Sequence, residues 1–432
     1  MKKTPTIIIS LLVVLLLVVV AYWYLFLRGT ITPIPNQTPN STSGFTPLNG
    51  NSSTGNSGNT NNNPGSTNTN PGSTGTTSVI TAKIPSLRLL SNTPVGGYGS
   101  NTTGSTTRVR WVDRGRGNIY EVVENTPSAT TLSNTILPRV NESVWNANLT
   151  AFIGSLVPDN NTGPTTIYSA LAARASTTAA TSTATDQYTP FQLKGNNLPA
   201  GVITYAVSPK KDRVFLLINQ NGVGVGYVAN FNGSAMKHLF DTPLTQVTAD
   251  WPETNTITLL TNPSLSDNGF FYFVNATTGY MNKVLGPIPG LIAVASHDAK
   301  YVVYSGIDAG GSVATNILTV SKNTSIDALI KTLANKCVWG NFYKSLVYCG
   351  VPRSFPTATY PDSWLLGAVS FADKIWQVNA DTGEAHLIST IVDQSDRVID
   401  AFNLGLDQKD NYLFFMNKSD LSLWSLDLVS TN

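Results

Sequence analysis

The feature that most constrains the fold is a repeated series of short apolar runs that fills the chain from Ile84 onward. The runs are about four to eight residues long and are separated by Gly, Asn, Asp or Pro. Runs of this length between turn residues are typical of β-strands, and long stretches with a helical period are missing. The sequence therefore predicts an all-β domain made of repeated strands.

The runs recur as a four-part unit. One unit comprises Met236–Phe240, Leu244–Trp251, Thr256–Leu260 and Phe270–Val274. A later unit comprises Ala328–Leu333, Lys336–Trp339, Leu346–Cys349 and Lys374–Val378. A period of about 40–50 residues with four strands per unit is typical of a β-propeller. We predict about seven blades between residues 84 and 428, with a β-sandwich or two stacked β-domains as the alternative.

Turn sequences carry a resemblance to known propellers. Ser208–Arg213 and Ser296–Lys300, which we expect between the second and third strands of their units, resemble the Ser-Pro-Asp-Gly-Lys-like turn of TolB-type propellers. Phe273–Gly279 and Ile375–Gly383 resemble the ends of quinoprotein-type blades, but the tryptophan usual a few residues beyond the Thr-Gly pair is missing. The resemblance implies an architecture and no particular function, because such folds host many activities.

The amino terminus predicts a membrane anchor. The run from Ile7 to Leu27 is interrupted only by Ser10, and as a helix it would span about 31 Å, close to the roughly 30 Å of a hydrocarbon core. Lysines precede it, and Arg28 is the only basic residue for about fifty residues after it, so the positive-inside rule predicts a cytoplasmic N-terminus. We therefore expect a cytoplasmic segment 1–6, a transmembrane helix 7–27 and a single-pass protein with its C-terminal domain outside the cytoplasm.

The alternative to an anchor is a cleaved signal peptide. Its apolar region would be about 7–15 residues long and would end in small side chains. In this chain the apolar run is longer, and Tyr22, Trp23 and Tyr24 stand where cleavage would need small residues. The uncleaved helix is the better interpretation.

Residues 28–80 are almost entirely Ser, Thr, Asn, Gly and Pro. Such a segment has too few apolar side chains to offset the entropy of ordering, so we expect a disordered linker between the helix and a propeller domain over 81–432. It would serve either as a tether that lifts the domain off the membrane or as a spacer of no special length.

Composition argues against several classes of function. The formal net charge is +2 and only 12% of residues are charged, so no strong field indicates a nucleic-acid partner. His238, His297 and His386 are far apart, and the two cysteines lack a CxxC spacing, so a metal site has little to be built from. The carboxylates stand mostly in turn-like contexts. We predict no cofactor and assign no catalytic residues.

Cys337 and Cys349 fall in consecutive predicted strands of one blade. If the hairpin turns about Tyr343, the two cysteines lie opposite each other on one face, at a separation that a disulfide can span. Outside the cytoplasm such a bond would form and persist. The alternative is a pair of buried free thiols.

The connection from Val351 to Phe371 is far longer than its counterparts in other units. Long loops on rigid scaffolds often carry function, and aromatic residues with arginine are typical of binding hot spots. The candidate binding residues are Arg353, Phe355, Tyr360, Trp364 and Leu365. The alternative is a loop that folds back and buries its aromatic residues.

These observations favour a membrane-tethered extracytoplasmic module that binds or scaffolds a protein or glycan partner at the cell envelope, without catalysis. One alternative is an envelope hydrolase or lyase with a carboxylate site at the central opening of the propeller. Another is a purely structural surface protein.

Overall fold

The structure is a computed structural model that describes residues 86–157, 163–174 and 189–429. The predicted cytoplasmic segment 1–6, transmembrane helix 7–27 and linker 28–80 lie outside the described residues. Within the described ranges, no helix is long and apolar enough to cross a membrane. The membrane-anchored arrangement therefore stays a prediction.

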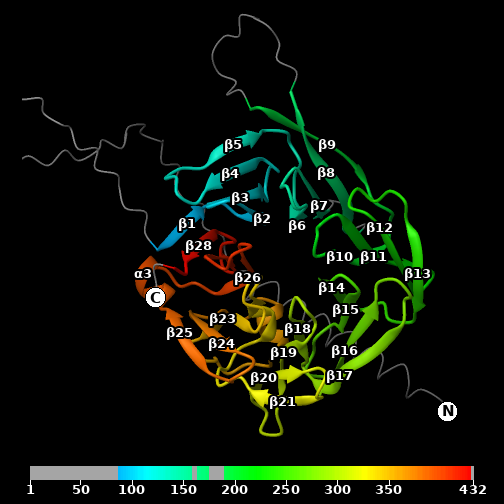
Figure 1. Cartoon of the computed structure of the whole chain (residues 1–432), viewed down its shortest axis with the longest axis vertical. Coiled ribbons are helices and arrows are strands. Elements are labelled where there is room, and N and C mark those ends of the chain that lie inside the picture. Colours follow the sequence, from blue (N-terminus) through cyan, green and yellow to red (C-terminus); the bar gives the residue numbers. More distant parts are fainter. Residues whose placement is uncertain (1–85, 158–162, 175–188, 430–432) are drawn as a thin grey trace, which may run out of the picture. The chain divides into compact units, whose positions relative to one another are not determined.

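Seven four-stranded antiparallel sheets surround a central axis, so the domain is an all-β, seven-bladed propeller (Figure 1). Blade 1 consists of β2 (Val95–Thr103), β3 (Thr106–Asp113), β4 (Ile119–Val123) and β5 (Thr130–Ser133). Blade 2 consists of β6 (Val140–Trp145), β7 (Ala151–Leu156), β8 (Thr165–Ala173) and β9 (Phe191–Asn197). Blade 3 consists of β10 (Val202–Val207), β11 (Arg213–Gln220), β12 (Val223–Asn230) and β13 (Lys237–Thr242).

The remaining blades repeat the same order from the axis outward (Figure 1). Blade 4 consists of β14 (Val247–Glu253), β15 (Thr256–Thr261), β16 (Asn268–Asn275) and β17 (Met281–Pro289). Blade 5 consists of β18 (Ile292–Ala295), β19 (Tyr301–Ile307), β20 (Val313–Thr319) and β21 (Thr324–Asp327). Blade 6 consists of β22 (Cys337–Trp339), β23 (Leu346–Pro352), β24 (Asp373–Asn379) and β25 (Ala385–Ser389).

Blade 7 is completed by a strand from the other end of the domain. It consists of β26 (Ala401–Leu406), β27 (Tyr412–Asn417), β28 (Leu423–Asp427) and, at its outer edge, β1 (Leu87–Ser91). The β1–β28 pairing sets Leu87 opposite Leu426 and Leu89 opposite Trp424. The ring is thus closed by hydrogen bonds between the first and last described strands.

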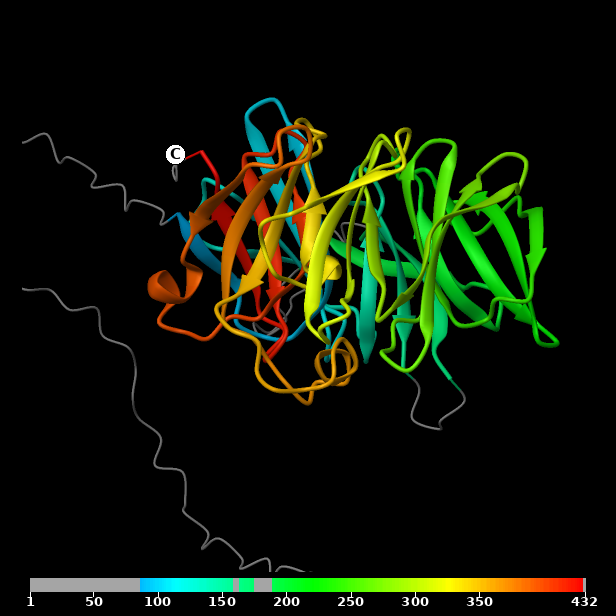
Figure 2. The same ribbon diagram turned by 90° about the horizontal axis from the view of Figure 1, so that it is seen from below.

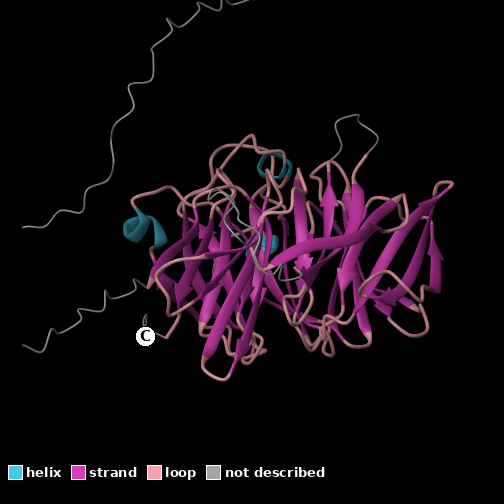
Figure 3. Cartoon of the chain, turned by 90° about the horizontal axis from the view of Figure 1, so that it is seen from above, coloured by secondary structure: helices cyan, strands magenta, loops and turns pink. Residues whose placement is uncertain are grey.

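The described helices are short and belong to connections between strands: the 3₁₀ helix η2 (Ala334–Lys336), α2 (Asp362–Leu365) and α3 (Ile391–Ser395) (Figure 3). Connections between first and second strands leave the disk at one end, and those between second and third strands leave it at the other. In the side view the β2–β3 hairpin projects at one end, and the connection containing α2 lies at the other (Figure 2).

The boundaries of the predicted units are displaced by one strand. Met236–Phe240, placed first in its predicted unit, belongs to β13, the outermost strand of blade 3. The turn motifs, which we expected between second and third strands, lie between first and second strands instead. Ser208–Arg213, for example, joins β10 to β11 of blade 3. Spacing along the chain is similar within and between blades, so it cannot indicate which strand lies at the axis.

Side-chain oxygens and left-handed backbone shape these first turns. The Ser208 hydroxyl donates to the Asp212 carboxylate at 2.7 Å, and the Ser296 hydroxyl donates to Asp298 at the same distance. Lys211 and Ala299 take the left-handed position, with φ of 54° and 55°. Both turns therefore begin with a serine, have a left-handed residue three positions later, and hold the serine hydroxyl on an aspartate, although that aspartate stands at a different position in each turn.

The core lies between neighbouring blades, where alternate side chains of each sheet are buried. Trp145, Trp251 and Trp339, on the innermost strands of blades 2, 4 and 6, are almost fully buried. The Trp339 indole donates to the Val294 carbonyl of blade 5 at 3.0 Å. Burial of both faces of every sheet is what a closed ring provides.

A buried carboxyl stands beside the closing strand. Arg88 of β1 lies with its Nη1 atom 3.7 Å from Glu124 Oε2, and Ser425 of blade 7 donates to the same carboxylate at 3.3 Å. Burial raises the pKa of Glu124 from its ordinary 4.5 to about 7, although Arg88 and Ser425 oppose the shift. The charged carboxylate is therefore disfavoured at the junction that closes the ring.

This shift predicts a pH-dependent closure. Because the folded-state pKa of Glu124 exceeds its unfolded value, its contribution to stability is fully present below about pH 4.5 and is lost as pH rises through about 7. We expect Glu124→Gln to be more stable than the wild type by about 1–2 kcal/mol at pH 8, with a smaller gain at pH 5. Thermal unfolding at the two pH values measures this, with the exposed Glu384→Gln as control; an equal effect at both pH values would contradict the prediction.

Candidate functional site

The long connection of blade 6 folds back onto the propeller. We call residues 353–372 the cap segment. Its Tyr360, Trp364 and Phe371 are buried in one core cluster with Leu291 and Ile292 near the start of blade 5, and Phe355 packs partly against them. These aromatic side chains are part of the core near the ends of the innermost strands. This is what we expected of a connection that folds back and buries its aromatic residues.

The cap segment is fixed by a buried cation. Lys336 has a fully buried side chain, and its ammonium group bonds Asp400, lies 2.8 Å from Asp373 and donates to the Ala401 carbonyl at 2.8 Å. The same ammonium group lies 5.0 Å from the ring centre of Trp364. A charge without solvent needs such partners, so Lys336 joins the cap segment to blades 6 and 7.

Asp400 gathers several donors from the cap segment. Its Oδ2 atom accepts the Trp364 indole N–H at 2.8 Å, the Phe371 backbone N–H at 2.9 Å and the Ser370 hydroxyl at 3.1 Å. Burial raises the pKa of neighbouring Asp373 to about 6, although Lys336 opposes the shift. Lys336, Asp373 and Asp400 are all fully buried, which indicates a structural role for this network.

The other candidate residues of this connection remain nearer the surface. Leu365 is 38% exposed, and the adjoining Leu366, which sequence reasoning did not select, is 84% exposed. Arg353 pairs with Asp393 at 2.6 Å. The five predicted binding residues therefore do not form one surface.

Burial of Trp364 predicts a structural effect. Trp364→Ala should lower the free energy of unfolding by about 3–5 kcal/mol, because it opens a cavity and removes a partner of Asp400. Leu366→Ala, two residues away but exposed, should change it by about 0.5 kcal/mol or less. Denaturant unfolding of the two variants checks this; equal effects would contradict a structural role for the cap segment.

Cys337 and Cys349 are directly paired residues of β22 and β23, and their sulfurs are bonded at 2.13 Å. The disulfide joins the first two strands of blade 6, close to the turn that carries the following site. Both cysteines are buried.

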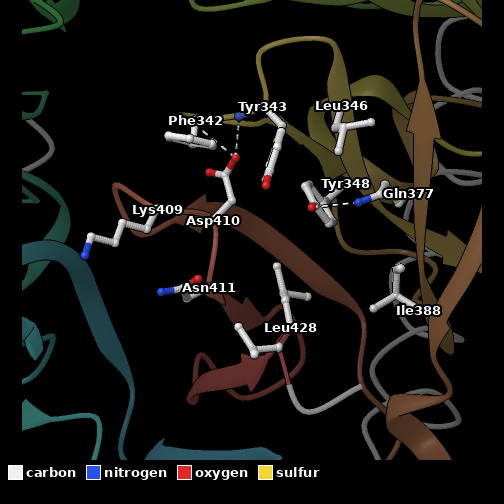
Figure 4. A pocket seen from close by; sticks show the side chains of 11 residues that line it. Phe342, Tyr343, Leu346, Tyr348, Gln377, Ile388, Lys409, Asp410, Asn411 and Leu428 are labelled. Carbon is white, nitrogen blue, oxygen red and sulfur yellow. Dashed lines mark hydrogen bonds between the residues drawn. The ribbon is translucent and has the colours of Figure 1, made fainter. Parts of the chain in front are cut away.

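At the opposite end of the disk from the cap segment, a hollow of about 560 Å³ opens between blades 6 and 7. We call it the aromatic hollow. Its lining combines apolar and polar groups: Phe342, Tyr343, Leu346, Tyr348, Gln377, Ile388, Lys409, Asp410, Asn411, Leu428 and Val429 (Figure 4). Phe342 is 65% exposed, Tyr343 55% and Val429 62%, which is unusual for large apolar side chains so close together.

A single carboxylate holds the two exposed aromatic residues in place. Asp410, in the β26–β27 turn, accepts backbone N–H groups of Asn341 at 2.8 Å, Phe342 at 3.1 Å and Tyr343 at 2.9 Å (Figure 4). A side chain at Gly340 would lie 2.8 Å from the same carboxylate and 2.2 Å from the Tyr343 carbonyl. The turn of blade 6 that carries Phe342 and Tyr343 is thus hydrogen-bonded to the turn of blade 7 that carries Asp410.

Two further polar groups of the aromatic hollow are also fixed. Lys409 donates to the Gly104 carbonyl of blade 1 at 2.6 Å. Gln377 donates to the Tyr348 hydroxyl at 2.7 Å (Figure 4). Burial raises the pKa of Tyr348, so this hydroxyl stays neutral. A preorganised surface of this kind loses little entropy when it binds a partner.

Sequence reasoning missed the aromatic hollow. Phe342 and Tyr343 stand at a hairpin tip, where Asp, Asn and Gly are usual, and two adjacent aromatic residues in that position were an available signal. Their partner Asp410 stands 68 residues from Phe342 and looks like an ordinary turn residue. Only the fold brings the two turns together.

The central opening also holds ionisable groups. Glu142 and Asp250 lie on the innermost strands β6 and β14, and both side chains are accessible to solvent. Surrounding protein raises the pKa of each by desolvation, and the nearby Tyr205 hydroxyl opposes the shift at Glu142. Glu142 and Tyr205 line a cavity of about 360 Å³. Among the described residues, no group of three or more His, Cys, Asp or Glu could hold a metal ion.

Comparisons with known proteins agree on the architecture. No family model matches the chain, and no curated protein matches it. Solved structures that it resembles include TolB from Acinetobacter baumannii, at 10% identity and a TM-score of 0.41, with 65% of this chain and 63% of TolB covered. The chain thus spans less than two thirds of TolB.

Two further structures are similar. Oligogalacturonate lyase from Vibrio parahaemolyticus has 10% identity and a TM-score of 0.50, covering 80% of this chain and 92% of the lyase. The β-propeller domain of the trilobed protease from Pyrococcus furiosus has 10% identity and a TM-score of 0.45, covering 76% and 94%. The predicted propeller architecture is confirmed by the seven four-stranded sheets of the structure itself. At such identities the likeness does not extend to activity.

The Asp410 contacts predict that this residue orders the aromatic turn. Asp410→Ala leaves three backbone N–H groups without their acceptor, so unfolding should become easier by about 1–3 kcal/mol and amide exchange should accelerate at residues 341–343. Denaturant titration and hydrogen exchange measure both effects. Asp267→Ala, in an exposed loop, is the control; unchanged exchange in Asp410→Ala would contradict the prediction.

Proposed function

We propose that this chain is a membrane-tethered extracytoplasmic propeller that binds a protein partner at the cell envelope through the aromatic hollow, without catalysis. The observation that carries the proposal is the pair of exposed rings, Phe342 and Tyr343, whose backbone is held by Asp410 at the aromatic hollow. Aromatic residues that project from a fixed backbone next to a pocket are the usual anchors of protein interfaces.

The geometry of the rings favours a protein over a glycan. Their planes are 84° apart with centroids 4.8 Å apart, so they do not form one flat platform for a sugar ring. They present an edge and a face beside Leu428 and Val429, which suits an apolar side chain that inserts between them. Lys409 and Asn411 at the margin supply polar contacts of the kind found at an interface rim.

The proposed location rests on the sequence before the propeller. The apolar run Ile7–Leu27 and the Ser/Thr/Asn/Gly/Pro-rich segment 28–80 would anchor the domain and hold it away from the bilayer. A binding disk on such a tether could reach a partner in the membrane or in a surrounding envelope layer.

Site-specific crosslinking tests the interface. We expect a photoreactive residue at position 342 in the full chain to crosslink one protein in intact cells, and the same residue at position 366 to crosslink none in common with it. Phe342→Ala/Tyr343→Ala should weaken capture of that protein at least tenfold without loss of folding, because both side chains are exposed. Equal crosslinking at both positions, or capture of a glycan alone, would refute the protein interface.

The topology has its own test. Protease added to intact cells or spheroplasts should digest the C-terminal domain and leave a fragment protected by the membrane. If the domain stays intact until the membrane is permeabilised, the proposed orientation is wrong.

A second candidate function is an envelope hydrolase or lyase, and Glu142 is the observation that favours it. Its carboxyl lies beside Tyr205 in the cavity at the central opening. Desolvation by the surrounding protein raises its pKa although the side chain is open to solvent, and a raised pKa is what a general acid requires. Under this alternative, Glu142→Gln would abolish cleavage of an envelope polysaccharide or peptide while leaving crosslinking through residue 342 unchanged. An assay of envelope digests with both proteins distinguishes the two functions.

A further inference from the structure

A second hollow opens at the other end of the disk from the aromatic hollow, where blades 1 and 2 meet the connection from blade 7. We call it the arginine hollow. It has a volume of about 760 Å³ and is lined by Arg114, Arg116 and Arg139, with Asp113 and Tyr120. Its sequence signal, an Arg-Gly-Arg-Gly loop between two strands, was not used in predicting function.

The loop that carries two of the arginines is tightly held. The Arg114 N–H donates to the Pro94 carbonyl at 2.9 Å, and the Leu137 N–H donates to the Arg116 carbonyl at 2.7 Å. Gly117 takes a left-handed φ of 78°, and a side chain there would lie 2.3 Å from the Leu137 carbonyl. Three chain segments are thus locked around the hollow, so the guanidinium groups project from a fixed frame.

Arg114 and Arg116 differ from Arg108 and Arg110 of the same blade. Arg108 and Arg110 both pair with Glu121, at 3.4 and 2.6 Å. Arg114 instead donates to neutral groups of Asn141, to the side-chain oxygen at 2.6 Å and to the backbone carbonyl at 3.1 Å. Across the described ranges, Arg116 has no carboxylate within ion-pair distance.

The one carboxylate in the lining, Asp113, accepts the backbone N–H of Arg116 at 2.7 Å. It therefore stabilises the loop, and Arg114 and Arg116 outnumber it among the described lining residues. Guanidinium groups arranged in this way bind carboxylate, sulfate or phosphate through paired hydrogen bonds.

An uncharged groove adjoins the arginine hollow. It has a volume of about 380 Å³, shares Thr93 and Tyr120 with the hollow, and is lined elsewhere by neutral residues such as Leu89 and Ala129. Tyr120 stacks on Trp111 with centroids 5.7 Å apart, which keeps its ring in place at the boundary. The two spaces together offer positive charge at one end and a neutral, partly aromatic wall at the other.

We propose that the arginine hollow binds an oxyanion, carried as a carboxylate, sulfate or phosphate on a neutral organic body that lies against Tyr120. Arg116 and Arg114 contact the oxyanion, and the neighbouring groove holds the body. The ligand contacts both the closing connection at Thr93 and the loops of blade 1, so its binding also stabilises the closed ring.

Titration calorimetry of the full chain in a non-ionic detergent tests the site, with phenyl phosphate, phenyl sulfate, benzoate and phenol as probes. We expect at least one of the three anions to bind saturably, phenol not to bind, and affinity to fall as sodium chloride is raised. The preferred anion identifies the oxyanion. Failure of all three anions to bind would overturn the proposal.

Variants locate the binding. Arg116→Ala should lower the affinity for the preferred anion about tenfold or more, and Arg116→Lys should lower it less. Arg108→Ala is the matched control. Arg108 lies in the same blade but is paired with Glu121, so this variant should change the affinity less than twofold. Tyr120→Ala should weaken phenyl phosphate more than inorganic phosphate. Equal losses in Arg108→Ala and Arg116→Ala, or no loss in Arg116→Ala, would overturn the assignment.

Discussion

The pairing of β1 with β28 is the constraint on which the rest of the structure depends. A single blade is a small sheet with two apolar faces, and it buries both only when it has a neighbour on each side. Closure of the ring gives every blade two neighbours, and the hydrogen bonds between Leu87–Ser91 and Leu423–Asp427 supply it. Glu124, Arg88 and Ser425 lie at this junction and connect its stability to pH.

The two ends of the disk use similar residues for different purposes. At one end, aromatic residues of the cap segment surround Lys336 and belong to the core. At the other end, Phe342 and Tyr343 project into solvent because Asp410 holds their backbone and no segment within the described ranges covers them. The arginines divide in the same way, since Arg110 is neutralised by Glu121, whereas Arg114 bonds a neutral side chain. Residue type alone therefore does not separate structural from binding roles in this fold.

Much of the fold could be predicted from the sequence. The strand runs, the Ser208 and Ser296 turns and the number of blades follow from alternation and turn chemistry, which act over a few residues. The predicted strand Ala328–Leu333 shows where this reasoning fails. The outermost strand of blade 5 is the exposed segment Thr324–Asp327. The apolar run after it is an irregular connection in which Ala328, Ile330 and Leu333 are buried. An outermost strand is hydrogen-bonded on one side only and needs no apolar face. The apolar residues after Asp327 therefore indicate burial and not a strand.

The sequence by itself determined a chain of short strands in groups of four, with seven groups and an apolar segment at its amino terminus. Only the tertiary structure decided which strand of each group lies at the axis, that the aromatic residues of the long connection are buried, and that an aromatic and an arginine-lined hollow open at opposite ends. The reason is separation along the chain: Asp410 meets Phe342 across 68 residues, and Leu87 meets Leu426 across the whole domain. Local patterns fix what each segment becomes, whereas contacts between distant segments fix what is left exposed to bind.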